Sequence, residues 1–153
     1  MDRSYVKAND ESRERLRKLA TEITDEELKL LIYNEGWTIA VALGHLAFWD
    51  ERRLALVKRW QQNCVEPSDI TGMDLDTIND ALVPLFLAMP VRNVVELAVS
   101  AAEKVDEELE SLSPELITAI EKLGDRHALD RSIHRKMHLD EIDVLLKAKR
   151  GGK

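Results

Sequence analysis

Glycine and proline are scarce in this sequence, and their scarcity limits what the chain can fold into more than any other feature does. Six glycines and four prolines occur among 153 residues, which is about half the roughly 12% share that the two residues have in average proteins. Because glycine and proline form most turns, a chain with few of them has few turns and long uninterrupted elements. The many short strands of a β-sandwich or β-barrel are therefore disfavoured, and an all-α fold is expected.

Apolar residues recur at helical spacing along most of the chain, which divides into long amphipathic segments. Pro84 and Pro90 must break or kink the third of these segments, because proline lacks a backbone N–H group and clashes with the preceding turn. Four long helices favour an antiparallel-type four-helix bundle, folded as a single domain over residues 1–153. We expect long helices over residues 5–22, 38–63, 91–112 and 130–150, a further helix over 75–87, a connecting loop over 67–72, and short helical turns over 25–33 and 115–123.

Several helix ends carry capping signals. Thr24 and Glu27 have the spacing of a capping box. Ser113 followed by Pro114 is typical of a helix start, and Asp130 is expected to cap the last helix. Three residues are alternative candidates for the N-cap of the first helix: Ser4, Asn9 and Asp10. The inward face of the last helix is expected to carry Ile133, Met137, Ile142, Leu145 and Leu146.

Composition and charge exclude several classes of protein. A net charge of −7 argues against a nucleic-acid partner, because phosphate binding depends on clustered Lys and Arg. The longest stretch without a charged residue, 36–49, is shorter than the roughly twenty residues of a membrane span. The N-terminus has no apolar core of a secretory signal, and the single cysteine, Cys64, cannot form an internal disulfide. We therefore expect a cytoplasmic protein in which Cys64 is inert.

The four histidines are the residues best suited to chemistry. His134 and His138 are one helical turn apart, so both imidazoles share a helix face and could bind one divalent ion, although chance spacing is the alternative. His45 lies in the most apolar stretch, and taken alone it is best explained as a core histidine bonded within the protein. When His45 is considered together with the pair of His134 and His138, the better interpretation is that three imidazoles converge on one metal. His127 is expected to be an exposed loop residue.

Two other metal architectures are excluded by the neighbours of these histidines. A di-iron bundle needs Glu three residues before a histidine, and a zincin needs Glu directly after its first histidine, where this chain has Arg135. The residues three before the histidines are Ala42, Gly124, Arg131 and Arg135. The predicted site is therefore mononuclear, without an adjacent base, and three protein ligands with an open position are typical of a catalytic site.

Residues near the histidines are weaker candidates. Glu141 could orient a ligand or act as a base, or it could be a solvated helix charge. Arg131 and Arg135 could hold an anionic substrate, or they could form a solvated face. Gly44 precedes His45, where a missing side chain could open room beside the metal. The aromatic residues near His45 are expected in the core rather than in a pocket wall: Trp37, Phe48 and Trp49.

These motifs, in this order, resemble the DinB-like superfamily over nearly the whole chain. The matching segments are Glu35-Gly-Trp-Thr38, Leu43-Gly-His45-Leu-Ala-Phe-Trp-Asp50, Asp76-Thr-Ile-Asn79 and His134-x-x-x-His138. Relatives in this superfamily include thiol-dependent transferases that use bacillithiol or mycothiol, and the metal-binding part of maleylpyruvate isomerase. The resemblance implies an up-down-down-up four-helix bundle, with His45, His134 and His138 as ligands of zinc, nickel or a similar divalent ion, and homodimers are common among such proteins.

Two hypotheses about function follow. In the first, the metal site activates a low-molecular-weight thiol, as in an S-transferase, or water, as in a hydrolase, because a divalent ion on neutral imidazoles lowers the pKa of a bound nucleophile. The partner is then a small-molecule substrate, and Glu141 and Arg135 are the candidate catalytic residues. In the second, the chain is a non-catalytic binding protein whose histidines hold a metal structurally or bond internally.

Overall fold

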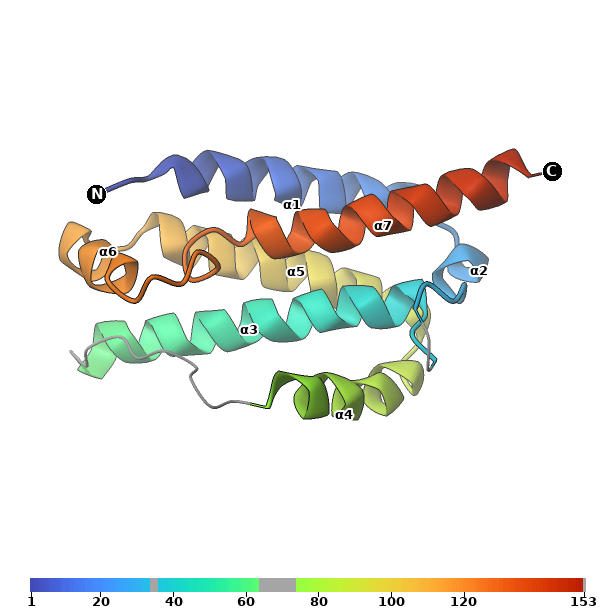
Figure 1. Ribbon diagram of the computed structural model, residues 1–153, viewed down its shortest axis with the longest axis horizontal. Coiled ribbons are helices and arrows are strands. Elements are labelled where there is room, and N and C mark those ends of the chain that lie inside the picture. Colours follow the sequence, from blue (N-terminus) through green and yellow to red (C-terminus); the bar gives the residue numbers. More distant parts are fainter. Residues whose placement is uncertain (34–35, 64–73, 153) are drawn as a thin grey trace.

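Seven helices make up the part of the chain that the computed structural model describes, residues 1–33, 36–63 and 74–152 (Figure 1). They are α1 (Ser4–Glu22), α2 (Asp25–Leu28), α3 (Ile39–Asn63), α4 (Leu75–Leu87), α5 (Val91–Glu110), α6 (Pro114–Glu121) and α7 (Ser132–Gly151). The all-α prediction is confirmed. Glu35, Cys64 and the predicted loop over 67–72 lie outside the described residues.

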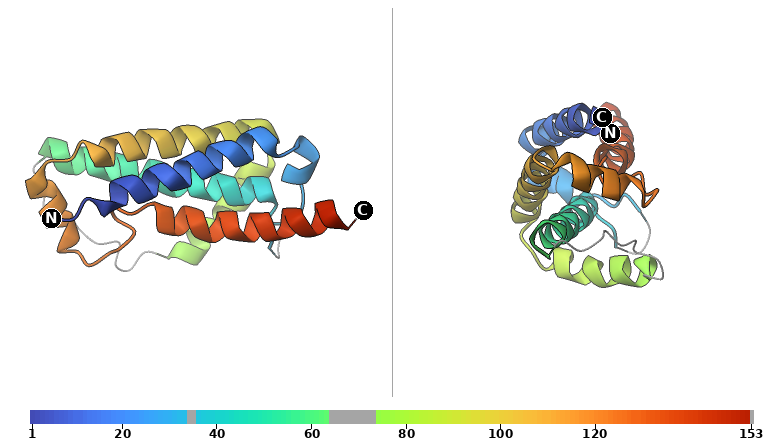
Figure 2. Two further views of the ribbon diagram at one scale, coloured as in Figure 1. Left: turned by 90° about the horizontal axis from the view of Figure 1, so that it is seen from above. Right: turned by 90° about the vertical axis from the view of Figure 1, so that its left-hand side faces the viewer.

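The four long helices have the expected up-down-down-up topology. Helices α1 and α7 run in one direction and α3 and α5 in the other (Figure 1). Helix α4 lies against α3 and returns the chain along it, which is why α3 and α5 point the same way. Each of α1 and α3 packs on both α5 and α7, and α4 lies outside this bundle (Figure 2). None of the described helices is long and apolar enough to cross a membrane.

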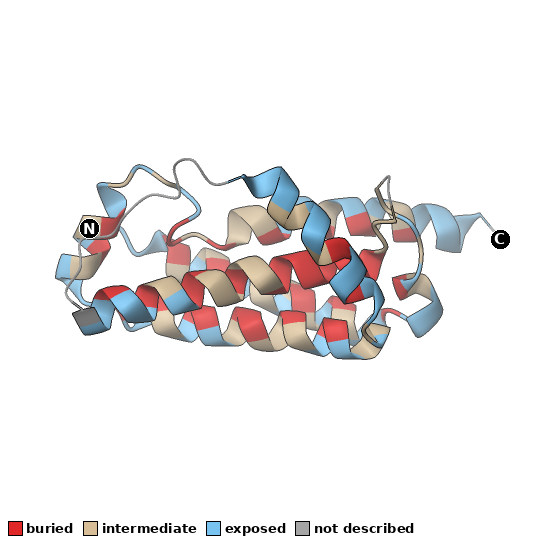
Figure 3. Ribbon diagram, turned by 90° about the horizontal axis from the view of Figure 1, so that it is seen from below, coloured by how far each residue is buried: buried red, intermediate tan, exposed pale blue. Residues whose placement is uncertain are grey.

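The first half of α3 is the centre of the core. Every residue from Ile39 to Ala47 is buried, as its nearly continuous apolar sequence predicts (Figure 3). The main apolar cluster joins this segment to Leu16 of α1, Ala98 of α5 and Ile142 of α7. The candidate ligand His45 therefore lies on the most buried helix of the bundle.

One predicted helical turn is shorter in the structure, whereas the bounds predicted for α4 are confirmed. Helix α2 ends at Leu28 rather than at residue 33, because the chain then turns and Leu31 pairs with Thr38 in an isolated bridge. Pro84 lies inside α4 and does not end it, and Pro90 occupies the N-cap of α5. The capping box at Thr24 and the cap at Ser113 are both present.

The ends of the other helices differ in detail from the expectation. Helix α1 starts at Ser4, and Asn9 is buried within it, where its side chain bonds residues of the segment before α7. Asp130 precedes the N-cap of α7, Arg131, yet its carboxylate accepts the backbone N–H of Ser132. Met137, expected to face inward, is half-exposed because it lies on the side of α7 that borders a cavity.

The open space expected beside Gly44 is filled by the ring of Phe86. A Cβ atom built there would lie 2.6 Å from two ring atoms of Phe86, so the missing side chain serves the close packing of α4 on α3. The prediction of open space beside the metal is wrong. The sequence shows the small residue, but only the fold shows which partner uses the space.

A buried network of charges joins three of the long helices. Arg135 of α7 donates to Asp106 of α5 at 2.8 Å from both Nη1 and Nη2, and its Nη2 lies 3.1 Å from Asp50 of α3. Arg131 donates from Nε to the other oxygen of Asp50 at 2.8 Å. Arg135 is 1% exposed and Arg131 is 4% exposed. The solvated face expected for these arginines is therefore wrong, because carboxylates of other helices pair with them inside the bundle.

We expect Gly44→Ala to lower the free energy of unfolding by about 1–3 kcal/mol, because the new methyl group overpacks the contact with Phe86. Urea unfolding measures the change. Gly151→Ala is the control, since nothing lies within 4 Å of a Cβ atom there, and we expect it to stay within about 0.5 kcal/mol of wild type. Equal effects of the two substitutions would contradict the packing role of Gly44.

We expect Asp106→Ala to lower the free energy of unfolding by about 3–5 kcal/mol, because it leaves the buried Arg135 short of a partner. Glu103→Ala on the same helix is the matched control. Glu103 pairs with Arg17 at the surface, where an ion pair contributes about 1 kcal/mol or less. Thermal or urea unfolding compares the two, and a loss of similar size in both would show that the buried network contributes little.

Candidate metal centre

Three histidines from two helices meet at one point. His45 is on α3, and His134 and His138 lie one turn apart on α7, which packs against α3. The centroids of the His45 and His134 rings are 4.8 Å apart, and each of these rings lies 5.0 Å from that of His138. One nitrogen of each residue lies within 4.8 Å of the others. The predicted convergence is thus present in the structure.

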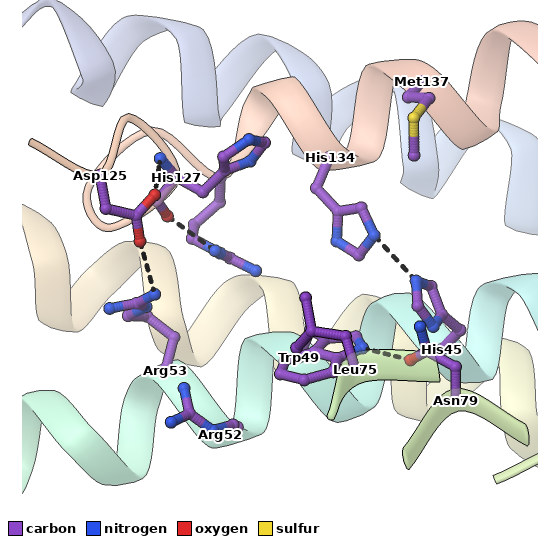
Figure 4. Close-up of a pocket in the computed structure, with 11 residues that line it drawn as sticks. His45, Trp49, Arg52, Arg53, Leu75, Asn79, Asp125, His127, His134 and Met137 are labelled. Atoms are coloured by element: carbon purple, nitrogen blue, oxygen red, sulfur yellow. Dashed lines mark hydrogen bonds and ion pairs between the residues drawn. The ribbon is translucent and has the colours of Figure 1, made fainter. Parts of the chain in front are cut away.

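The nitrogen atoms of these rings fit a shared ligand. Nε2 of His45 lies 2.9 Å from Nε2 of His134 (Figure 4). Nε2 of His138 is buried and has no hydrogen-bond partner among the described residues. A buried polar nitrogen without a partner is costly, so a group that does not belong to the chain would relieve it. Three imidazole nitrogens are a donor set that zinc, nickel and similar divalent ions accept.

Burial keeps these imidazoles neutral. Desolvation, with smaller contributions from the neighbouring histidines, lowers the pKa of His45 to about 4 and that of His134 to about 2. Burial also lowers the pKa of His138 below its usual value. A neutral imidazole has a free lone pair, which is the form that binds a metal.

Tyr33 holds the third histidine in place. Its hydroxyl lies 2.8 Å from Nδ1 of His138, and the two rings meet edge-on. Burial and the carboxylate of Glu141 raise the pKa of Tyr33, so the phenol stays neutral at pH 7. With Nδ1 engaged by Tyr33, Nε2 of His138 is the nitrogen that remains for a ligand, and such a partner fixes the orientation of the ring.

Tyr33 is the residue near the site that the sequence analysis missed. It falls at the end of the turn predicted over 25–33, and no motif spacing relates it to His138, which lies 105 residues away. Glu141 is exposed on α7 and stands beside Tyr33 rather than among the imidazoles. The orienting role expected for Glu141 stays a prediction, as does the alternative of a solvated helix charge.

A cavity of about 340 Å³ opens beside the histidines (Figure 4). Trp49 forms part of its wall, and Asn79 of α4 fixes the indole by accepting a hydrogen bond from Nε1 at 3.0 Å. The expectation that Trp49 belongs to the core is therefore wrong, whereas Trp37 and Phe48 pack against a buried apolar cluster as expected. The lining residues are His45, Trp49, Arg52, Arg53, Leu75, Asn79, Asp125, His127, Arg131, His134 and Met137.

The other candidate residues are distributed around this cavity. His127 is exposed, as predicted, and it lines the cavity without joining the histidine cluster. Arg131 reaches the cavity while paired with Asp50. Neither Arg135 nor Glu141 is among the lining residues. The guanidinium of Arg135 is committed to carboxylates of the core, which leaves it without a free face for a substrate.

We expect Tyr33→Phe to weaken zinc binding about 10- to 100-fold, because His138 loses the partner that orients its ring. A competition titration against a zinc-binding dye measures the affinity. Tyr5→Phe is the control: the Tyr5 hydroxyl donates to the backbone oxygen of Leu109, so the substitution should cost about 1 kcal/mol of stability and leave zinc affinity unchanged. Unchanged affinity in Tyr33→Phe would show that the hydroxyl does not support the site.

Comparison with known proteins agrees with this architecture. The profile of the DinB superfamily matches residues 8–145. No curated protein and no solved structure matched the chain. The match covers most of the chain, including all three clustered histidines. The chain belongs to the DinB superfamily.

Proposed function

We propose that this chain is a divalent-metal-dependent enzyme that acts on a small molecule at the cluster of His45, His134 and His138. One observation carries the proposal: three neutral imidazoles converge beside a cavity that opens to solvent, and two of them, those of His45 and His134, line it. The cavity, at about 340 Å³, is within the size range of small-molecule sites. Three protein ligands leave a position for a substrate or nucleophile, which is the arrangement of catalytic rather than structural sites.

The chain's own residues supply binding and orientation. Nε2 of His138 and Nε2 of His134, together with His45, would hold the ion, and Tyr33 keeps the His138 ring turned toward it. A divalent ion such as zinc or nickel, when bound there, lowers the pKa of a thiol or water molecule that reaches it. Leu75 and Trp49 add apolar wall for the hydrocarbon part of a substrate.

The scarcity of carboxylates in the cavity favours a thiol over water as the nucleophile. Among the described lining residues Asp125 is the one carboxylate, and it accepts hydrogen bonds from Arg53 and from the backbone N–H of His127. The described lining residues therefore offer no free carboxylate as a general base, and the imidazole of His127 lies outside the histidine cluster. The ordinary pKa of a thiol is about 8.5, whereas the pKa of water is about 15.7. A thiol therefore loses its proton far more readily than water does.

We infer an S-transferase that uses a low-molecular-weight thiol of the bacillithiol or mycothiol type. The thiolate sulfur would attack an electrophilic carbon of the second substrate. A carbon–sulfur bond forms as the bond to the leaving group breaks, and the leaving group departs with the electron pair. Water in place of the thiol would make the same site a hydrolase.

A non-catalytic binding protein is the second candidate function, and one contact favours it. At 2.9 Å, Nε2 of His45 and Nε2 of His134 are close enough to share one hydrogen without any ion. In that case the cluster would be an internally bonded polar group of the core. The unpartnered Nε2 of His138 is the feature that this alternative leaves unexplained.

Metal content tests the proposed metal site. We expect wild-type protein, purified without an affinity tag, to contain about one zinc, nickel or similar ion per chain, and His138→Ala to lose it. His127→Ala is the matched control, because His127 is exposed and lies outside the cluster. Elemental analysis measures the ion, and unfolding curves show that the variants remain folded.

Turnover then tests the reaction. Wild-type protein should accelerate the displacement of chloride from 1-chloro-2,4-dinitrobenzene by a small thiol, and His138→Ala should not. Hydrolysis of an activated ester, followed in parallel, is the assay for the water reaction. Metal-free wild-type protein would overturn the proposed metal site, whereas bound metal without turnover in either assay would favour the non-catalytic binding protein.

We also propose that the protein works as a homodimer in the cytoplasm. The homodimer rests on the family resemblance alone, and the compartment on the single cysteine of the sequence. A reducing compartment would keep a small thiol available as substrate.

A further inference from the structure

The cavity beside the histidines has two chemically different ends. On α3, Arg52 and Arg53 follow His45 by about two turns, and on α7 Arg131 precedes His134 by about one turn. Because α3 and α7 run in opposite directions (Figure 1), residues that follow His45 and residues that precede His134 lie on the same side of the histidines, and Figure 4 shows Arg52 and Arg53 there. All three arginines line the cavity. One end is thus a cluster of neutral imidazoles, and the other is cationic.

Arg53 is buried without adequate partners. Its side chain is only 7% exposed, and its Nε atom has no hydrogen-bond partner among the described residues. Its one ion pair there, with Asp125, has a distance of 3.5 Å from Nη2 to Oδ2, well beyond the roughly 2.7–2.9 Å of a strong charge-assisted bond. A guanidinium in this state has unused capacity to bind an anion.

Arg135 shows what a structural arginine looks like in the same protein. It is buried to a similar degree, and its three guanidinium nitrogens all donate to Asp50, Asp106 or neighbouring oxygens. Arg53 lacks such a set of hydrogen-bond acceptors among the described residues. The comparison indicates that Arg53 is not simply a second member of the core network.

The local charge around Arg53 is not balanced. Arg52 stacks over Trp49 at 5.8 Å and forms no ion pair with a described residue. Burial, followed by the charge of Arg131, lowers the pKa of Arg53 to about 10 and also lowers that of Arg52. Asp50 already pairs with Arg131. Of the guanidiniums of Arg52 and Arg53, only that of Arg53 pairs with a carboxylate among the described residues, that of Asp125, in a protein whose net charge is negative.

We propose that Arg53 and Arg52 form a subsite for a carboxylate or phosphate group of the small molecule that reaches the histidines. Planar guanidiniums recognise both groups through paired N–H donors. His45 and Arg53 are eight residues apart, or about 12 Å along the axis of α3. The substrate is accordingly an elongated anionic molecule, with its reacting group at the imidazoles and its charged group at the arginines. The role of the reacting group rests on the proposed function, but anion binding itself does not.

Anion titration of metal-free protein tests the subsite separately from the metal. The protein is treated with a chelator, dialysed, and titrated with succinate and with inorganic phosphate, while NMR follows the side-chain Nε–Hε signals of its arginines. We expect saturable shifts of the Arg53 signal. The anion that binds more tightly identifies the group as a carboxylate or a phosphate.

Three substitutions on α3 locate the binding. Arg53→Gln should weaken anion binding at least about tenfold, because charge-assisted hydrogen bonds are lost, and Arg52→Gln should weaken it less. Arg59→Gln is the control, since it removes the same charge from an exposed position on the same helix and should change nothing. If Arg53→Gln fails to fold, Arg52→Gln and the wild-type Arg53 signal still decide the question.

The outcomes separate this inference from the proposed function. Anion binding that persists in His134→Ala but is lost in Arg53→Gln supports the subsite whether or not the protein binds metal. Binding that is lost in His134→Ala and kept in Arg53→Gln would place the anion at the histidines and overturn the subsite. An absence of binding by wild-type protein at tens of millimolar succinate or phosphate would overturn it as well, without affecting the metal proposal.

Discussion

The ion pairs that join Arg135 of α7 to Asp50 of α3 and Asp106 of α5 are the interaction on which the candidate site depends. Arg135 reaches Asp50 and Asp106 from the residue directly after His134, so the same ion pairs that hold α7 in the bundle also set its register along α3. Sliding α7 by one turn, about 5.4 Å, would leave a buried guanidinium unpaired, which is strongly unfavourable. His134 and His138 therefore meet His45 because a buried salt bridge beside them has little freedom to move.

Buried polar groups in this bundle are of two kinds. Those of the core network are paired: Asp50 and Asp106 each accept from more than one donor, and Arg135 is satisfied on every nitrogen. Those of the histidine cluster and the cavity wall are less fully paired: Nε2 of His138, Nδ1 of His45 and Nε of Arg53 have no hydrogen-bond partner among the described residues, and elsewhere Nε of Arg13 is in the same state. Unpartnered buried atoms cost stability and are uncommon in folded proteins. Three of these four atoms lie in the histidine cluster or in the wall of the adjacent cavity, which is the physical reason to look for a ligand there.

The sequence was sufficient for everything that depends on spacing along one helix. Few turns and helical periodicity predicted the bundle, and the i, i+4 pair of His134 and His138 on one face was confirmed. What failed required knowledge of a facing helix: the carboxylates that bury Arg135, the Phe86 ring against Gly44 and the Tyr33 hydroxyl on His138. Each of these partners is remote in sequence, and composition and periodicity contain no information about which helices meet.

The position of the histidines also indicates that a bound metal would serve chemistry rather than folding. The apolar core continues on both sides of the cluster, from Leu16 and Leu139 to Val57 and Leu109, and it is complete without any ion. A chain of this length buries enough apolar surface to fold unaided. An ion would therefore add little that folding requires, whereas the buried imidazoles of His45 and His138, each with an unpartnered nitrogen, reduce stability as long as nothing binds them. Selection for stability alone would replace such residues with apolar ones, so their presence beside a cationic cavity is better explained by chemistry than by architecture.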